Sequence, residues 1–305
     1  MNDGLESSAQ AACAELRSAV DMIRWAASTM TAHGVYHGHG FDNAVDEALH
    51  LVLRTLHLPA DIPDTLLESW LTRDERAAIA ARVRRRVEER KPAAYLTGRA
   101  RFAGLEFDVD ERVLVPRSPI AELIECGFAP WVDCDSVDKV LEIGTGSGCI
   151  SVACAVHMPW VHIVATDIST EALALARRNA TANGVDDRVS FVTGDLFTDV
   201  EGRFDLIVSN PPYVALADLA AAPPEFHHEP VVGLAAGEDG LDVVGRMLKE
   251  AAHYLSPRGV LVVEVGVSRR YLEAAFPDLP FQWPEFERGG EGVFVIEREP
   301  LERLG

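Results

Sequence analysis

The stretch FDLIVSNPPYV, residues 204–214, decides how this chain is organised. Its LIVS segment consists of apolar or small residues, which is typical of a buried parallel strand. Asn210-Pro211-Pro212-Tyr213 then ends the strand, because proline lacks the backbone N–H that a sheet needs and fixes φ. A rigid turn at the carboxyl end of a strand lies where open α/β sheets bind their ligands.

The residues of this turn suit a planar amino group. The side-chain oxygen of Asn210 and the carbonyl oxygen of Pro211 can accept both hydrogens of an NH2 group. The ring of Tyr213 can stack on the flat group that carries that nitrogen. Taken alone, the motif favours a cis-proline turn that binds nothing, so the binding hypothesis depends on the other motifs of the chain.

Strands and helices alternate on both sides of this stretch. Seven strands are predicted, at residues 139–143, 162–166, 189–193, 205–209, 260–265, 281–287 and 293–298. The last two are joined by a glycine-rich loop and are expected to pair as an antiparallel hairpin at the sheet edge. The pattern predicts an α/β fold with a mostly parallel sheet and helices on both faces.

Residues 1–91 are predicted to form a separate helical domain. Apolar residues at helical spacing predict helices at 9–30, 46–56 and 77–89. Thr72-Arg73-Asp74-Glu75 is typical of a capping box that opens the third helix. The arginines at positions 82, 84, 85 and 86 are expected on a solvated face, paired with Glu88 and Glu89.

Residues 92–117 are expected to form a β-hairpin linker that turns at Gly104, and residues 118–305 the α/β domain. Ser118-Pro119 is expected to open the first helix of that domain. Three histidines, His33, His37 and His39, lie in a glycine-rich loop without a carboxylate or cysteine at a recognised ligand spacing, so no metal site is predicted there.

Composition restricts the function classes. The net charge of −20 disfavours binding to a phosphate backbone and suits a basic protein partner. Five cysteines without a CxxC pair indicate reduced thiols and a cytoplasmic protein. No apolar run approaches the roughly 20 residues needed to cross a bilayer, so no membrane association is expected.

A second motif, E-I-G-T-G-S-G at residues 142–148, lies where the strand at 139–143 becomes a helix. Position 149 is cysteine rather than the third glycine of a dinucleotide site, which disfavours a nicotinamide or flavin enzyme. Asp167 ends the next strand, where an acid can hold two ribose hydroxyls. Asp195 could accept from an adenine amino group while Leu196 covers the ring, although each aspartate also fits a helix cap or turn. The residues expected to bind a nucleoside cofactor are Glu142, Gly144, Thr145, Gly146, Ser147, Gly148, Asp167, Asp195, Leu196 and Asn210.

These motifs resemble the class I S-adenosylmethionine-dependent methyltransferases, whose Rossmann-like sheet matches the predicted pattern. NPPY is similar to their amino-group-modifying branch. The segments KPAAYLTGRARFAGLEFDVDERVLVPRSPI, EIGTGSGCI, FHHEP…GEDGLD and GGEGVFVIE narrow the resemblance to the protein-glutamine N5-methyltransferases. YHGHGFDNAVDEALHLVL and VPRSP are most similar to the branch that acts on large-subunit ribosomal protein L-three, because the release-factor branch typically has a PRPDTE-like stretch instead.

The resemblance implies methyl transfer from S-adenosylmethionine, with S-adenosylhomocysteine as product, to a glutamine side chain of a translation protein. It implies that Asn210, Pro211, Pro212 and Tyr213 form the catalytic site and that the helical domain contacts the substrate. Two other hypotheses remain: methylation of a nucleic-acid base, which needs a basic groove, and a binding module that senses the cofactor. Weaker candidates at the substrate side are Arg117, which an ordinary salt bridge would also explain, and His227-His228-Glu229.

Overall fold

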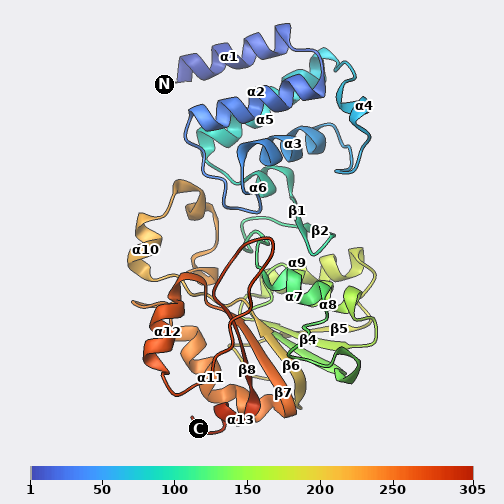
Figure 1. Ribbon diagram of the computed structural model, residues 1–305. Coiled ribbons are helices and arrows are strands. Elements are labelled where there is room, and N and C mark those ends of the chain that lie inside the picture. The colour runs from blue at the N-terminus through green and yellow to red at the C-terminus, as the bar shows by residue number, and fades with distance from the viewer. Residues whose placement is uncertain (1, 305) are drawn as a thin grey trace. The chain divides into compact units, whose positions relative to one another are not determined.

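The computed structural model describes residues 2–304 and divides into two units (Figure 1). The helical unit comprises the described residues up to Arg99 together with Pro223–His228. The sheet unit comprises Ala100–Ala222 and the residues from Glu229 onward. The chain therefore divides within the segment 92–117 that was assigned to a linker, and a short piece from the α/β half of the sequence belongs to the helical unit.

Among residues 2–304, no helix combines the length and the apolar character that a bilayer crossing requires.

The helical unit is built from α1–α6 around an apolar core that includes Met22, Leu51 and Ile79. Its helices are α1 Asn2–Glu15, α2 Ala19–Ala32, α3 Ala44–Thr55, α4 Asp64–Leu67, α5 Arg73–Glu89 and α6 Ala93–Thr97. The single helix predicted for 9–30 is wrong, because Ser18 starts α2 afresh with a reciprocal capping box to Asp21. Serine and aspartate three residues apart were the available signal.

The other two helices are confirmed, as is the capping box in which Thr72 and Glu75 bond to each other's backbone. Arg85 pairs with Glu89 one turn along α5, as predicted for a solvated face. The prediction is wrong for Arg86, whose side chain is only 1% exposed. Arg86 faces the interior of the helical unit, where apolar side chains alone could not neutralise it.

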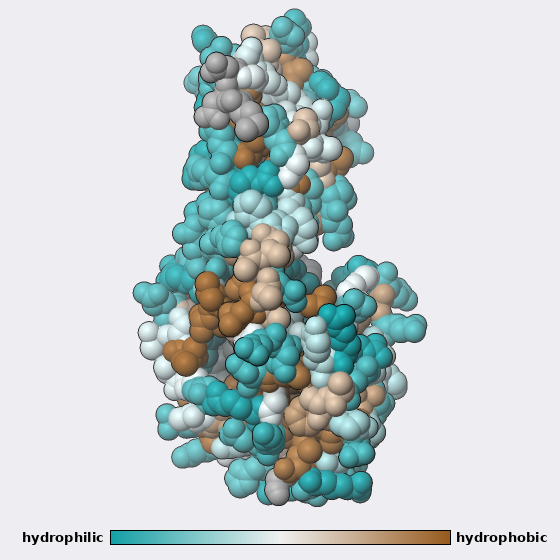
Figure 2. Space-filling view, turned by 90° about the vertical axis from the view of Figure 1, so that its left-hand side faces the viewer, coloured by the Kyte–Doolittle hydropathy of each residue, from teal (hydrophilic) through white to brown (hydrophobic). Residues whose placement is uncertain are grey.

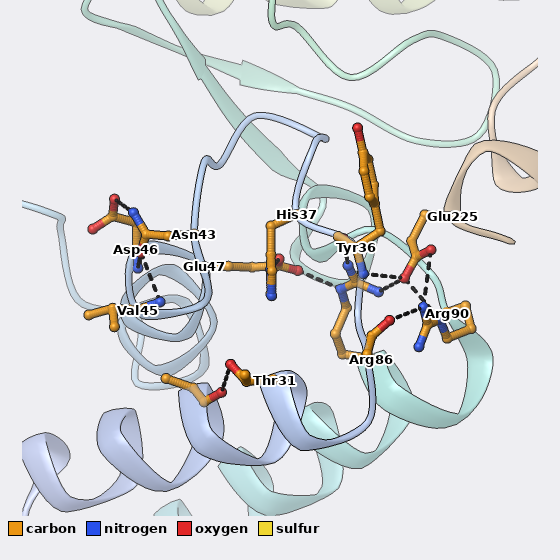
Figure 3. Close-up of polar contacts among 12 residues, drawn as sticks. Thr31, Tyr36, His37, Asn43, Val45, Asp46, Glu47, Arg86, Arg90 and Glu225 are labelled. Carbon is orange, nitrogen blue, oxygen red and sulfur yellow. Dashed lines mark hydrogen bonds and ion pairs between the residues drawn. The ribbon is translucent and has the colours of Figure 1, made fainter. Parts of the chain in front are cut away.

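Arg86 is paired with two buried glutamates (Figure 3). Its Nε lies 2.5 Å from Glu47 Oε1 and its Nη1 lies 3.1 Å from Glu225 Oε1. Glu225 also accepts from the Tyr36 backbone N–H at 3.1 Å and pairs with Arg90 at 2.9 Å. The cluster thus holds Pro223–His228, a segment distant in sequence, within the helical unit.

The histidine-rich loop contributes to this cluster rather than to a metal site. His37 Nδ1 lies 2.5 Å from Glu47 Oε2, and the ring of His39 packs edge-on against Phe226. Within the described part of the chain, no group of three or more histidine, cysteine or acidic side chains is arranged to hold a metal ion.

The sheet unit begins with a two-stranded hairpin, β1 Arg99–Phe102 and β2 Leu105–Asp108, turning at Gly104 with φ +78° as predicted. The main sheet has the strand order β5-β4-β3-β6-β7-β8. All neighbours are parallel except β7 and β8. Its strands are β3 Lys139–Ile143, β4 His162–Asp167, β5 Val189–Thr193, β6 Phe204–Ser209, β7 Leu255–Glu264 and β8 Val293–Glu297.

Helices flank this sheet on both sides (Figure 1). Alternate residues of β3, β6 and β7 pack with α11 in one apolar core, which includes Leu141, Ile207 and Leu261. The α-helices of this unit are α7 Ile120–Glu125, α8 Cys149–His157, α9 Thr170–Ala182, α10 Leu216–Ala221, α11 Asp242–Tyr254, α12 Arg269–Ala275 and α13 Arg298–Leu301. Short 3-10 turns are η1 Cys134–Ser136, η2 Pro224–His228 (in the helical unit), η3 Val231–Gly233 and η4 Gly266–Ser268.

The α/β fold with a mostly parallel sheet and an antiparallel edge is confirmed. One strand of the predicted edge hairpin does not form: within 281–287, only Gln282 makes an isolated bridge, to Val295 of β8. Pro280 and Pro284 lie on either side of Gln282 and cannot donate to a ladder, so pairing stops after one residue. The segment instead packs Phe281 and Trp283 against Phe294.

Candidate active site

One pocket lies at the carboxyl edge of the sheet, where β3, β4 and β6 end side by side. It has a volume of about 250 Å³ and lies within the sheet unit. Every residue expected at the cofactor and catalytic positions lines it except Gly148. Since the residues come from four separate segments of the chain, the sheet is what brings them together.

The glycine loop is held against β4 by its backbone. The N–H groups of Gly144 and Thr145 both donate to the Thr166 carbonyl at 2.9 Å. Gly144 and Gly146 have positive φ and no atom within 4 Å of a would-be Cβ, so their backbone is open to the pocket. Gly148 is different, because a Cβ there would lie 2.9 Å from the Ala176 side chain of α9. The third glycine therefore serves helix packing rather than ligand approach.

The buried carboxyl group of Glu142 links the glycine loop to α8 by hydrogen bonds. Its Oε2 accepts hydrogen bonds from Thr145 Oγ1 at 2.5 Å, from the Ser151 backbone N–H at 3.0 Å and from the Ser151 hydroxyl. Burial raises the pKa of Glu142 to about 7, against the lowering effect of these bonds. With its side chain committed in this way, Glu142 ties the loop to the first turn of α8.

The two aspartates expected to contact a nucleoside have different surroundings. Asp167 accepts from the backbone N–H groups of Gly146 and Ser169, both at 2.8 Å, and burial raises its pKa. Asp195 is half exposed, and both of its carboxylate oxygens accept from Arg246 of α11, at 2.7 and 3.2 Å. Asp167 thus links the glycine loop to the start of α9, while Asp195 is already paired.

The NPPY turn is anchored directly before Asn210. The Ser209 hydroxyl donates to the Ile143 carbonyl at 2.6 Å and joins β6 to β3 directly before the motif. Asn210 is partly buried in the pocket wall, and its side chain makes no hydrogen bond to any other described residue. An amide with free acceptor and donor positions at the edge of a pocket is available to a ligand.

An ion pair joins two loops beside the pocket. Arg117 donates to both oxygens of Glu229, at 2.5 and 2.7 Å, so the salt-bridge alternative for Arg117 is correct. Glu229 also accepts from the Val115 backbone N–H at 3.0 Å. This pair joins two loops whose residues line the pocket, while His227 and His228 belong to the helical unit.

Glu264, the last residue of β7, is not among the site residues predicted from the sequence. It is 6% exposed and accepts a hydrogen bond from the Tyr213 hydroxyl at 2.8 Å. The available signal was an acid at the end of an apolar strand, the same pattern that pointed to Asp167.

Several apolar side chains are exposed on the side of the sheet unit that carries α10 and α12 (Figure 1). Figure 2 views this side, and hydrophobic surface gathers on it over the sheet unit. Val232 lines the pocket and is 59% exposed, and Leu216, Val231, Val267 and Tyr271 are also exposed on the short helices nearby. A surface of this kind suits contact with a polypeptide.

Comparison with known proteins gives matches of three kinds: a family model, curated relatives and solved structures. The family model described as methyltransferase small domain matches residues 129–228. The ribosomal protein uL3 glutamine methyltransferase of Francisella tularensis is 47% identical over 283 residues, which are 92% of this chain and 90% of that protein. The enzyme of the same name from Xanthomonas campestris is 47% identical over 95% of this chain and 94% of its own. A methyltransferase crystal structure from Pyrococcus furiosus is 22% identical, with a TM-score of 0.47 over 64% of this chain and 89% of its own.

Proposed function

The chain belongs to the family of the ribosomal protein uL3 glutamine methyltransferases. From this premise we propose that it methylates a glutamine side-chain nitrogen of uL3, the large-subunit ribosomal protein L-three. Membership confirms the family predicted from the motifs, including the choice of the ribosomal branch over the release-factor branch. The observation that carries the mechanism is the unbonded Asn210 amide at the mouth of the pocket.

The residues of the pocket fit S-adenosylmethionine as the methyl donor. The open backbone of Gly144 and Gly146 would accept the close approach of its amino-acid part, and Asp167 would accept from its ribose hydroxyls. Leu196 would cover the adenine ring. When bound, this cofactor supplies a methyl group activated by a positively charged sulfur.

The chain contributes alignment rather than a strong base. A carboxamide nitrogen is a weak nucleophile, since its lone pair is shared with the carbonyl group. Asn210 Oδ1 and the Pro211 carbonyl oxygen would accept its two N–H groups, and Tyr213 would stack on its plane. These contacts would orient the nitrogen and stabilise the positive charge that develops on it as it takes up the methyl group. The amide proton then leaves to solvent.

A protein substrate is favoured over a nucleic acid by two observations. The net charge is −20, and the exposed apolar side chain of Val232 lines the pocket. Basic ribosomal proteins complement such a charge, whereas phosphate backbones do not. The helical unit would then bind the body of the substrate, and the five unpaired cysteines agree with a cytoplasmic enzyme.

Replacement of Asp167 by alanine is expected to weaken binding of S-adenosylmethionine by about 10- to 100-fold, the equivalent of one or two hydrogen bonds to a charged group. The loss has two sources, the ribose contacts and the anchor on the Gly146 N–H. Isothermal titration calorimetry measures it directly. Asp187→Ala, at an exposed carboxylate, is the control and should bind as the wild type does. Equal affinity of the two variants would contradict the assignment of Asp167.

The substrate assignment is tested with labelled S-adenosylmethionine and separately purified uL3, release factor, ribosomal RNA and DNA. Label is expected in uL3 only, on a glutamine located by mass spectrometry of the peptides. Label in release factor alone would overturn the substrate, and label in RNA or DNA would overturn the substrate class.

A further inference from the structure

The hydroxyl group of Tyr213 belongs to a buried hydrogen-bond chain at the bottom of the site. It donates to Glu264 Oε1 at 2.8 Å, and the Ser118 hydroxyl donates to Glu264 Oε2 at 2.5 Å. Ser118 Oγ in turn accepts the backbone N–H of Ile120 at 3.2 Å, at the start of α7. Three segments of the sheet unit therefore converge on one carboxyl group.

The backbone around Tyr213 is packed as closely as the ring. A Cβ at Gly266 would lie 2.7 Å from Tyr213 Cε2, and a Cβ at Gly240 would lie 2.2 Å from the Tyr213 carbonyl oxygen. The Ser268 hydroxyl donates to that same carbonyl at 2.7 Å. Gly292 lies against Gly266 and accepts hydrogen bonds from Val265 and Gly266 through its carbonyl. Gly240 of GEDGLD and Gly266 thus lie directly against Tyr213, and Gly292 of GGEGV supports Gly266.

Burial of the Glu264 carboxyl group lowers the stability of the fold unless its hydrogen bonds offset the loss of water. Isolating a carboxyl group from water is unfavourable, and a well-packed apolar residue at position 264 would avoid that loss. Burial raises the pKa of Glu264, and burial together with the neighbouring Glu264 raises the pKa of Tyr213 well above its ordinary value. The phenol therefore keeps its proton, which it donates to Glu264.

We propose that Glu264 is a positioning residue: by binding the Tyr213 hydroxyl it fixes the plane of the ring on which the substrate carboxamide stacks. The inference rests on the proposed function, because the stacked group is the glutamine amide. A carboxylate is suited to this role, since it accepts from Tyr213 and Ser118 at once through two differently directed oxygens. Hydrogen bonds to a charged acceptor are also shorter and stronger than neutral ones.

A double-mutant cycle with Tyr213→Phe and Glu264→Leu tests the coupling. Tyr213→Phe keeps the ring and removes only the hydroxyl, so it should lower kcat by about 10-fold with unchanged affinity for S-adenosylmethionine, the size of one good hydrogen bond. Glu264→Leu should lower kcat by a similar factor, and the double variant by about the same factor rather than the product. Glu264→Gln, which keeps one acceptor for the phenol, should retain more activity than Glu264→Leu.

Asp205→Asn provides the matched control. Asp205 accepts from backbone N–H groups at the other end of β6, so its effect should multiply with that of Tyr213→Phe. Wild-type kcat in Tyr213→Phe, or multiplying effects of the Tyr213 and Glu264 variants, would overturn the proposal. The measurement of kcat in Tyr213→Phe tests the proposal even if Glu264→Leu fails to fold.

A second readout does not depend on activity. Selective 13C labelling of the five tyrosines resolves the Tyr213 ring by NMR. In the wild type, the ring should rotate slowly, so that its two edges give separate signals. In Glu264→Leu, faster rotation should average these signals. If Glu264→Leu does not fold, Glu264→Gln should show signals broadened by exchange. Unchanged ring motion overturns the positioning role, whereas a wild-type enzyme that leaves uL3 unlabelled overturns the proposed function instead.

Discussion

Replacement of Asn210 by alanine is expected to reduce kcat by about 100- to 1,000-fold, the cost of removing one preorganised contact to a developing charge. The expected loss is large because, in the proposed mechanism, Asn210 is one of the two groups that accept from the substrate nitrogen. The other, the Pro211 carbonyl, lies on a backbone that two prolines hold rigid. Single-turnover measurement with uL3 and labelled cofactor separates the chemical step from product release.

Binding of S-adenosylmethionine should change little in Asn210→Ala, because the glycine loop and Asp167 remain intact. Asn183→Ala is the matched control. Asn183 follows α9 and donates to the backbone carbonyls of Glu106 in β2 and Asn179 in α9, outside the pocket, so the variant should keep wild-type kcat. Turnover within a few-fold of wild type in Asn210→Ala would show that the side chain does not act on the nitrogen.

The second large effect concerns stability. Arg86→Met should destabilise the protein by about 3–5 kcal/mol, because it leaves Glu47 and Glu225 buried without their shared cation. Chemical denaturation followed by circular dichroism measures the change. Limited proteolysis should also cut the variant within Pro223–His228, since Arg86 is one of the groups that hold that segment in the helical unit.

Arg85→Met, one position earlier on α5, is the control for Arg86→Met. Arg85 is 54% exposed and its partner Glu89 is 42% exposed, so its loss should cost less than about 1 kcal/mol. Equal stability of the two variants would contradict a structural role for the buried cluster.

The pH dependence of the cluster has a definite sign. Burial alone would raise the pKa of Glu47 and Glu225, but in both the hydrogen bonds and the charge of Arg86 outweigh burial and lower it below the ordinary 4.5. A carboxyl group with a lowered folded pKa stabilises fully above its unfolded value, and that stability is lost as the pH falls through the folded value. Wild type should therefore lose its advantage over Arg86→Met below about pH 4.5, as denaturation at a series of pH values would show.

Local patterns predicted well wherever one segment determines its own structure. The capping box at Thr72–Glu75 and the Gly104 turn formed where their residues indicated, because their hydrogen bonds join near neighbours. Predictions failed where a distant partner decides. The pattern predicts Arg86 as one more arginine on a solvated face, whereas its buried side chain pairs with Glu47 and Glu225, which lie 39 and 139 positions away.

In the candidate site, too, local patterns predicted some residues, while contacts between distant segments could not be predicted. Acids and glycines at the ends of strands indicated one edge of the sheet, because the carboxyl ends of parallel strands meet there. Asp195 showed the limit of that argument, since the pattern could not reveal that Arg246 already occupies both of its oxygens. Glu264 shows the limit in the other direction, because no local pattern connects it with Tyr213, 51 positions earlier.

By itself, the amino-acid sequence determined the α/β class of this protein, the NPPY turn at a strand end and the glycine loop, and its motifs pointed to the family. These properties follow from spacing, backbone restriction and short-range bonding, which a chain carries wherever it folds. Only the tertiary structure decided which side chains face each other around Tyr213, and that a short segment after α10 joins the helical unit. Burial makes the difference, because the partner of an enclosed charge or ring is set by packing in space and not by distance along the chain.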